Sequence, residues 1–269
     1  MDEVIAAVLG PGARTTSALA GAGGASVRAV TGAGGEALVV KTAPAGAAPD
    51  LLRAARAQES ARAAGVPVPR TVAAREVAGT QVHVTERVVG RGWSEVHPHA
   101  GDAVRRAVLA ELTEVLARLR AAVQPGFGEL DAPGEPERDA LRERTRRRVP
   151  AGWRLDAAER LLDRHGALFD GGAGAVLVHG DLHHGNVLVR PDGPGWRLAA
   201  VLDWDSAWAG PADADAARAA LWDGMPGAPD GADGRAAVQQ LLWCLEYRDE
   251  GARHRADTAR LAARLGVVL

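Results

Sequence analysis

Lysine and asparagine each occur only once in this chain of 269 residues, at Lys41 and at Asn186. The chain is crowded with alanine, glycine and arginine, which indicates a sequence that has replaced lysine and asparagine wherever a substitute serves. Arginine is a poor substitute for a compact ammonium aimed at phosphate oxygens. Aspartate replaces a metal-binding amide only by changing the charge at the ion. One such survivor is easily a coincidence, but two are better explained by phosphate and metal chemistry.

The middle of the chain alternates short apolar runs with polar turns. One turn reads His179-Gly-Asp181-Leu-His-His-Gly-Asn186, and a later apolar run ends at Asp203. Phosphoryl transfer needs a carboxylate that orients the attacking hydroxyl and accepts its proton. It also needs a second carboxylate and a neutral oxygen ligand that hold Mg²⁺ against the nucleotide phosphates. Asp181, Asp203 and Asn186 supply this set, in the order found in kinase catalytic loops.

Each of these residues also has a structural explanation. Asp181 and Asn186 suit an ordinary turn or a helix cap. Asp203 suits a structural salt bridge, and Lys41 suits the exposed side of a strand. Their joint spacing nevertheless favours the catalytic interpretation.

The surrounding sequence predicts a β-rich first third and a mainly helical remainder. A helix from Pro49 to about Ala64 is stopped by Gly65 and Pro67. Gly34 and Gly35 indicate a hairpin. The other expected strands and apolar runs are residues 27–30, 37–42, 70–76, 81–89, 175–178, 187–189 and 198–202, and the other expected helices are residues 102–123 and 155–169. We therefore expect an α+β protein with one part at residues 1–90 and another at residues 91–269.

Composition excludes several classes of protein. With 47% hydrophobic and 25% charged residues and a net charge of -2, the chain is typical of a globular protein without general attraction to nucleic acid or anionic membranes. A single cysteine, Cys244, excludes an intramolecular disulfide. No apolar run approaches the roughly 20 residues of a membrane span, and the start MDEVIAAVLGPG does not resemble a signal peptide. We expect a cytoplasmic protein.

The polar turns carry a resemblance to a known family. The block from His179 to Asn186, the Val-Leu-Asp203-Trp run and the segment Gly210-Pro-Ala-Asp-Ala-Asp215 resemble the aminoglycoside phosphotransferase superfamily, which includes choline, homoserine and fructosamine kinases. Ala37-Leu-Val-Val-Lys41 and Gly65-Val-Pro-Val-Pro69 also fit, so the resemblance covers nearly the whole chain. It implies a bilobal protein-kinase-like fold, with a small antiparallel β-sheet lobe containing one helix and a larger, mainly α-helical lobe.

The resemblance assigns roles to individual residues. It implies that Asp181 is the catalytic base and that Asn186 and Asp203 bind Mg²⁺. Lys41 takes the position that binds the α- and β-phosphates of ATP, and the preference for ATP over GTP stays open. The partner of Lys41 should be a glutamate in the following helix, and Glu59 is the one acid between Asp50 and Glu76.

Further residues are expected to contact the nucleotide. Gly23, Gly24 and Ser26 match a phosphate-covering loop, although Ser26 replaces the third glycine of the protein-kinase pattern and a plain β-turn explains the segment as well. The adenine should contact backbone around Glu86 to Val88.

The remaining polar residues of the turns are expected to support the loop or are read in two ways. His179 is expected to hold its loop by hydrogen bonding, and Asp215 is expected to brace the same loop from the following helix. His183 and His184 are adjacent on a turn, where two histidines rarely converge on one metal ion. Asp205 is either a second polar residue of the metal loop or simply exposed.

The acceptor is predicted to be a small-molecule alcohol, with an aminoglycoside or another cationic antibiotic as the first choice. Acidic and aromatic residues in the last third suit a cationic ligand, although exposed acids on helices explain them as well. They are Asp223, Asp230, Asp233, Glu246, Asp249 and Glu250, with Trp208, Trp222, Trp243 and Tyr247. The arginine-rich run 142–148 is read as a solvated helix face rather than a nucleic-acid site.

The sequence therefore predicts an ATP- and Mg²⁺-dependent O-phosphotransferase. A fructosamine, choline, homoserine or sugar kinase on the same fold is the first alternative, and a non-catalytic nucleotide-binding pseudokinase is the second. A protein kinase is disfavoured because no activation segment ends in an Ala-Pro-Glu signature. The sequence leaves open whether the protein is a monomer or a homodimer.

Overall fold

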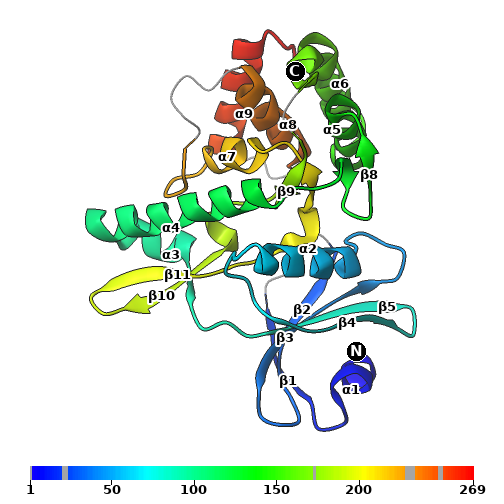
Figure 1. Ribbon diagram of the computed structural model, residues 1–269, viewed down its shortest axis with the longest axis vertical. Coiled ribbons are helices and arrows are strands. Elements are labelled where there is room, and N and C mark those ends of the chain that lie inside the picture. The colour runs from blue at the N-terminus through cyan, green and yellow to red at the C-terminus, as the bar shows by residue number, and fades with distance from the viewer. Residues whose placement is uncertain (1, 20–23, 172–173, 228–233, 248–250) are drawn as a thin grey trace. The chain divides into compact units, whose positions relative to one another are not determined.

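The computed structural model describes residues 2–19, 24–171, 174–227, 234–247 and 251–269 (Figure 1). The chain forms two compact units. The first unit combines Met1–His99 with Gly185–Ala207, and the second combines Ala100–His184 with Trp208–Leu269. Both contain antiparallel sheets and helices, so the predicted α+β class is confirmed.

The first unit is organised by a five-stranded antiparallel sheet. Its spatial order is β1-β2-β3-β5-β4, with β1 at Arg14–Leu19, β2 at Ser26–Thr31, β3 at Ala37–Pro44, β4 at Thr71–Val77 and β5 at Thr80–Glu86. Lys41 lies on β3, between Val27 of β2 and His83 of β5 in the register. The lysine is therefore held by a central strand with a hydrogen-bonded neighbour on each side.

The two faces of this sheet carry different kinds of side chain. Leu38 and Val40 of β3 are buried on the face that packs against Ile5 of α1 (Asp2–Leu9). Because successive side chains alternate along a strand, Val39 and Lys41 lie on the opposite face, where they line a cavity. The core is thus kept on one side and the polar site on the other.

Helix α2 (Leu51–Ala63) contacts β3, β4 and β5. The Asp50 side chain caps its start by accepting a hydrogen bond from the Arg53 amide at 2.9 Å. The buried side chain of Gln81 accepts from the Leu51 amide at 2.9 Å and donates to the Pro44 carbonyl, also at 2.9 Å. These bonds fix the first turn of α2 to β3 and β5.

The first unit also contains a three-stranded sheet that supports the segments of Asn186 and Asp203. Its order is β11-β10-β6, with β6 at Arg91–Gly92, β10 at Val187–Asp192 and β11 at Gly195–Val201. The short helix α3 (Trp93–Val96) and the 3₁₀ turns at His97–His99, His184–Asn186 and Trp204–Ser206 complete it. The Leu202 amide donates to the Asn186 carbonyl at 2.8 Å, which ties the segments of Asn186 and Asp203 together.

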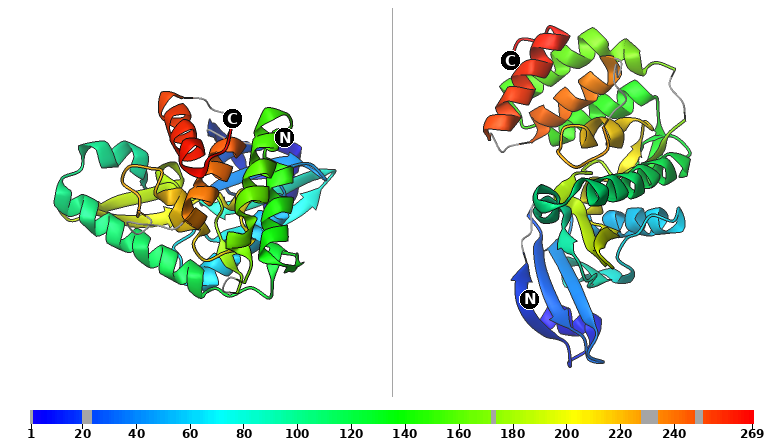
Figure 2. Two further views of the ribbon diagram at one scale, coloured as in Figure 1. Left: turned by 90° about the horizontal axis from the view of Figure 1, so that it is seen from above. Right: turned by 90° about the vertical axis from the view of Figure 1, so that its left-hand side faces the viewer.

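The second unit is mainly helical, and Figure 2 shows its helices from two further sides. They are α4 (Asp102–Ala121), α5 (Glu137–Arg148), α6 (Trp153–His165), α7 (Ala214–Ala219), α8 (Gly234–Glu246) and α9 (Ala252–Leu265), with a 3₁₀ turn at Gly166–Phe169. Its core contains Leu161, Leu241 and Leu261, because α8 packs against both α6 and α9. A four-stranded sheet in the order β8-β7-β12-β9 lies beside α4 and α5, with β7 at Phe127–Glu129, β8 at Ala132–Glu135, β9 at Val176–Val178 and β12 at Trp208–Gly210.

Several elements differ from the sequence-based expectation. Between residues 124 and 136, where no strand or helix was expected from the sequence, the chain forms the hairpin of β7 and β8. Pro133 and Gly134 obscure this strand signal, yet both are tolerated because β8 is an edge strand. Strand β12 and helix α1 were also not predicted, and the arginine-rich run 142–148 belongs to a helix that begins at Glu137.

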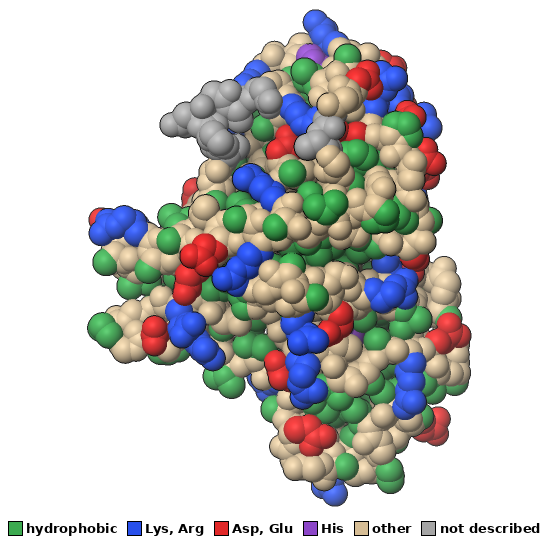
Figure 3. Space-filling view, in the orientation of Figure 1, with side chains coloured by type: hydrophobic (Ala, Val, Ile, Leu, Met, Phe, Trp, Pro, Cys, Tyr) green, Lys and Arg blue, Asp and Glu red, His purple; other side chains and the backbone are tan. Residues whose placement is uncertain are grey.

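Two further features bear on the class of protein, namely the apolar length of the helices and the charges on the surface. Within the described parts of the chain, no helix is both long enough and apolar enough to cross a membrane. Acidic and basic side chains are interspersed on the face shown in Figure 3.

Candidate active site

The first unit contains a cavity of about 390 Å³, which lies in the size range of small-molecule sites. Lys41 and Val39 of β3 form part of its wall. The connector after β5, including Glu86 and Val88, forms another part. The remaining lining includes Leu19, Val27, Ala54, Gln58, Pro69, His83, Leu188 and Leu202, together with Asn186, Asp203, Trp204 and Asp205.

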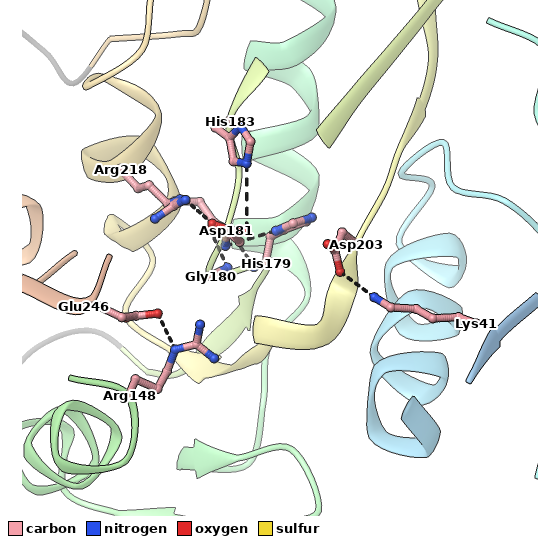
Figure 4. Close-up of polar contacts among 10 residues, drawn as sticks. Lys41, Arg148, His179, Gly180, Asp181, His183, Asp203, Arg218 and Glu246 are labelled. Atoms are coloured by element: carbon pink, nitrogen blue, oxygen red, sulfur yellow. Dashed lines mark hydrogen bonds and ion pairs between the residues drawn. The ribbon is translucent and has the colours of Figure 1, made fainter. Parts of the chain in front are cut away.

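Lys41 is held by two carboxylates in this cavity. Its Nζ atom lies 2.9 Å from Oδ1 of Asp203 and 2.5 Å from Oδ2 of Asp205 (Figure 4 shows the first contact). Burial alone would lower the pKa of Lys41, but the charges of Asp203 and Asp205 outweigh it and raise the pKa above its ordinary value. Lys41 is therefore a fixed ammonium at neutral pH.

The carboxylate of Asp205 lies in an environment that disfavours its charge. Burial, followed by repulsion from Asp203, raises the pKa of Asp205 to about 6. When both groups are ionised, two carboxylates share one ammonium and leave an excess negative charge in a half-buried site. Asp205 is therefore part of the site rather than a simply exposed residue.

The backbone at Asp203 is itself unusual. Asp203 adopts the left-handed conformation, with φ 62° and ψ 71°. This conformation is costly for residues other than glycine, although aspartate tolerates it better than most. The following Trp204 is buried and its Nε1 donates to the Val201 carbonyl at 3.2 Å. The protein thus anchors a strained turn to aim the Asp203 carboxylate.

The donor set suits a hard divalent cation. Asn186, Asp203 and Asp205 line one cavity and offer an amide and two carboxylates, and Mg²⁺ prefers oxygen ligands of this kind, shared with phosphates. The excess negative charge at Asp203 and Asp205 is a second observation that fits such an ion. Among the residues described, no group of three or more His, Cys, Asp or Glu side chains is placed to hold a metal.

The predicted pair between Lys41 and Glu59 is wrong. The Glu59 carboxylate instead accepts from Arg62 Nε at 2.8 Å and from the Thr71 amide at 3.3 Å. The helix presents Ala54 and Gln58, four residues apart, to the cavity. Because one residue turns a helix by about 100°, Glu59 points to the side of the helix. Asp203 and Asp205 take the place expected for the glutamate.

The other residues predicted to contact the nucleotide differ in where they lie relative to the cavity. Glu86 and Val88 line the cavity. Gly24 has φ 87° and Ser26 begins β2, while Val27 is the residue of that strand that reaches the cavity wall. Gly23 lies outside the described residues. Contact of these residues with a nucleotide stays a prediction.

In the second unit, Asp215 fixes the loop that carries Asp181. The carboxylate oxygens of Asp215 accept hydrogen bonds from the backbone amides of His179, at 2.7 Å, and Gly180, at 2.9 Å. The Asp181 amide donates to Nδ1 of the fully buried His179 at 3.1 Å. Gly180 has φ 75°, which favours glycine at this turn. The predicted bracing roles of His179 and Asp215 are confirmed.

The Asp181 side chain has two neighbours in Figure 4. Arg218 donates through Nη2 to Oδ1 of Asp181, and Nε2 of His183 lies 3.8 Å from Oδ2. Burial, with smaller contributions from other charges, lowers the pKa of His183 to about 4, so this histidine is neutral at pH 7. Sequence analysis missed Arg218, although its position three residues after Asp215 on a helix places the two side chains close together.

The acidic residues expected to attract a cation are partly neutralised. Glu246 is paired with Arg148, and Asp223 is paired with Arg253. The other four lie outside the described residues: Asp230, Asp233, Asp249 and Glu250.

The aromatic side chains of this region do cluster. Trp243 stacks on Tyr247 with ring centroids 5.3 Å apart and meets Trp222 edge-on at 5.7 Å. These rings and His254 line a cavity of about 180 Å³. The second unit therefore offers aromatic surface, with arginines rather than bare carboxylates beside it.

Comparisons with known proteins identify the fold. The structure of a thermostable mutant of aminoglycoside phosphotransferase APH(4)-Ia, in a ternary complex with AMP-PNP and hygromycin B, matches at 17% identity and a TM-score of 0.70, over 99% of this chain and 96% of that chain. A proposed fructosamine-3-kinase from Thermobifida fusca YX-ER1 matches at 21% identity and a TM-score of 0.66, over 98% of both chains. An aminoglycoside-3'-phosphotransferase of type VIII matches at 24% identity and a TM-score of 0.57, again over 98% of both.

These likenesses confirm the predicted bilobal protein-kinase-like fold. Among curated proteins, none matches the sequence of this chain. The family model described as "phosphotransferase enzyme family" (APH) matches residues 15–262. Because this match spans most of the sequence, the chain belongs to the phosphotransferase enzyme family.

Proposed function

We propose that this phosphotransferase moves the γ-phosphoryl group of ATP to a hydroxyl of a small molecule, with Mg²⁺. The observation that carries the proposal is the Lys41 ammonium bound to Asp203 and Asp205, in a cavity that also contains Asn186. A fixed cation beside two oxygen-rich metal ligands matches what a triphosphate requires. The family membership supports the same reaction class.

In the nucleotide site, the base would lie against the connector at Glu86 to Val88, and Lys41 would bind phosphate oxygens. Asn186, Asp203 and Asp205 would hold Mg²⁺, which when bound offsets the charge of the phosphates. One similar structure is a complex with AMP-PNP, and ATP rather than GTP is our proposed donor. Residues 1–90 would bind the nucleotide and residues 91–269 would carry catalysis and the acceptor, except that Asn186 and Asp203 belong to the first compact unit.

In the second unit, Asp181 is the proposed catalytic base. Its loop is held rigid by His179 and Asp215, so the carboxylate is presented in one orientation. A hydroxyl that donates to Asp181 is oriented for attack on the γ-phosphorus and loses its proton to the carboxylate as the bond forms. The neutral His183 lies beside this carboxylate without adding a charge.

The acceptor class is proposed at two levels. A small-molecule alcohol follows from the family. An aminoglycoside or other cationic antibiotic is supported by the likeness to a fold that binds hygromycin B, whereas the likeness to a proposed fructosamine-3-kinase supports a glycated amine or related sugar. Turnover of a panel of such alcohols distinguishes them.

The test is ADP release from ATP with that panel, together with nucleotide binding by calorimetry. Asp181→Asn should abolish turnover and leave nucleotide affinity intact, because Asp181 lies outside the cavity of Lys41. Asp203→Asn should remove the Mg²⁺ dependence of nucleotide binding. Asp163→Asn, at an exposed carboxylate on α6, is the matched control and should change neither. Nucleotide binding without ADP release toward any alcohol would instead indicate a pseudokinase.

A further inference from the structure

A second cavity, of about 60 Å³, lies in the second unit next to the Asp181 loop. It is enclosed by α5, α7 and α8, by Val178 at the end of β9 and by Gly180 in the turn that follows. The polar side chains that line it are Arg144, Asp215, Arg218, Gln239 and Glu246. Its volume admits about two water molecules, or one small polar group of a larger ligand.

Arg218 is buried with unused hydrogen-bond donors. Its side chain is only 5% exposed, and one face of the guanidinium lies 4.1 Å from the centroid of the Trp243 ring. Nη2 donates to Asp181, but among the described residues the buried Nε and Nη1 atoms have no hydrogen-bond partner. A buried donor without a partner costs free energy, and more so when it is charged.

Gln239 and Arg144 add further unpaired groups to the same cavity. Gln239 is 9% exposed, and neither its amide nitrogen nor its amide oxygen has a hydrogen-bond partner in the part of the chain that the structure describes. The Arg144 guanidinium lies 4.8 Å from the centroid of the Trp208 ring. Within the described ranges of the chain, Arg144 forms no ion pair with a carboxylate. Burial, followed by repulsion from Arg148, lowers the pKa of Arg144 to about 9.

The two carboxylates of the lining are already engaged. Asp215 accepts from the backbone amides of His179 and Gly180. Glu246 accepts from Nε of Arg148. The cavity therefore contains more N–H donors than its own acceptors satisfy.

We infer that this cavity is a subsite for an anionic group, a carboxylate or a phosphate, carried by the acceptor alcohol. Two guanidinium groups and a primary amide can donate to the oxygens of one such group, and arginine–carboxylate and arginine–phosphate bonds are among the strong hydrogen bonds of proteins. The inference rests on the proposed function, because it places the anchor of the acceptor beside Gly180, next in sequence to Asp181. It predicts a hydroxylated acid rather than a polycationic aminoglycoside as the substrate.

The binding arm of the test uses inorganic phosphate as the probe. Phosphate should raise the melting temperature and change the tryptophan fluorescence, and Trp243→Phe, which replaces the ring that stacks on Arg218, should identify the part of this signal that comes from Trp243. Gln239→Leu and Arg144→Gln should each weaken this binding by about tenfold or more, since each removes a hydrogen bond to a charged group. Lys41→Met should leave the Trp243 signal in place, which separates this subsite from the nucleotide site. No effect of phosphate on wild-type protein would overturn the inference.

The matched control for the arginine change is Arg146→Gln. Arg146 is on the same helix but is exposed and paired with Glu159. It should bind phosphate as wild type does. A loss of binding as large as that in Arg144→Gln would attribute the effect to the general charge of α5 and overturn the assignment to the cavity.

The turnover arm compares hydroxy acids with their carboxamides in ADP release. The acid should be preferred by at least about tenfold in kcat/KM, and Gln239→Leu should reduce that preference. Phosphate should compete with the acid and not with ATP; non-competitive inhibition would show that the anion is not part of the acceptor. Equal turnover of acid and carboxamide would overturn the inference and leave the phosphotransfer proposal standing. A different result would be that phosphate binds to wild type and not to Gln239→Leu or Arg144→Gln, while no alcohol causes ADP release. That result would keep the anion site and refute phosphotransfer.

Discussion

Asp181 Oδ1 accepts a hydrogen bond from Nη2 of Arg218, and the two side chains differ sharply in burial. Arg218 is 5% exposed, whereas Asp181 is 30% exposed. Within the described chain, Asp181 is the one hydrogen-bond acceptor that Arg218 has. The proposed catalytic base is therefore also the counter-ion of a buried cation.

This asymmetry predicts that Asp181→Asn destabilises the fold. The variant removes the negative charge but leaves a buried guanidinium, so the free energy of unfolding should fall by about 1–3 kcal/mol. Arg218→Met should lower the free energy of unfolding by less than Asp181→Asn does, since the Asp181 carboxylate that it leaves without a partner can be solvated. Urea unfolding of both variants measures the difference.

The double variant Asp181→Asn/Arg218→Met provides the control. Because it removes both partners, it should be more stable than Asp181→Asn alone, as is found when both members of a buried pair are replaced. If the double variant lost as much stability as the two single variants lose together, the pair would be energetically uncoupled and the prediction would be contradicted.

Lys41 allows a second, chemical test, because it is the only lysine in the chain. An amine-reactive reagent such as trinitrobenzenesulfonate should modify Lys41 slowly at neutral pH, since Asp203 and Asp205 raise the pKa of its ammonium. ATP with Mg²⁺ should protect Lys41 from modification. Peptide mass analysis measures the labelled fraction, and the α-amino group provides an internal reference for reagent activity.

The variant Asp205→Asn should label faster at the same pH. Loss of one carboxylate lowers the pKa of Lys41, and the free amine increases about tenfold for each unit by which that pKa falls. Labelling of Lys41 that is insensitive to both nucleotide and Asp205→Asn would place the lysine outside the nucleotide site.

Asp205 predicts a third result, the pH dependence of stability. Its pKa in the folded protein, about 6, is above the ordinary value of 3.8. The folded state therefore binds this proton more tightly than the unfolded state. The stabilisation by the protonated carboxyl is fully present below about pH 4 and is lost as the pH rises through about 6.

Asp205→Asn lacks this titration and should gain stability relative to wild type between pH 4 and pH 7. Unfolding by urea at several pH values measures the gain, and Mg²⁺ should reduce it by favouring the ionised carboxylate in the wild type. Asp163→Asn, which changes an exposed carboxylate, is the control. If wild type instead became more stable relative to Asp205→Asn as the pH rises from 4 to 7, the assignment of a raised pKa to Asp205 would be contradicted.

The parts of the site that sequence analysis predicted are those set by local order along the chain. Lys41 on a strand, the His179 to Asn186 turn and the Asp203 turn have the residue types and spacing that phosphate and metal chemistry require. The alternation of β3 places Lys41 opposite the core side chains Leu38 and Val40, and this could be read from the period of two.

The parts that sequence analysis missed depend on tertiary contact or on helix rotation. Arg218 meets Asp181 only because α7 packs beside the loop that follows β9. Arg144 was read as part of a solvated helix face, since a run of arginines does not show which member turns inward onto Trp208. Strand β12 pairs with residues distant in sequence, so its three residues carry no signal of their own.

Glu59 is the clearest case of such an error, and it yields the fourth prediction. The sequence offered one acid in the right helix, but the structure turns Gln58 rather than Glu59 toward the cavity. Glu59 is 37% exposed and pairs with Arg62. Glu59→Ala should therefore keep kcat/KM for ATP within about twofold and cost less than about 1 kcal/mol in stability, as exposed ion pairs do.

Gln58→Leu is the informative comparison for this prediction. The buried Gln58 amide donates to the Pro69 carbonyl at 2.8 Å, so its loss leaves a buried acceptor and should lower stability by about 1–3 kcal/mol. ADP-release kinetics and thermal unfolding of both variants measure these effects. If Glu59→Ala reduced turnover as severely as Lys41→Met, the glutamate would pair with Lys41 during catalysis, and the assignment of Asp203 and Asp205 as the lasting partners of the lysine would be wrong.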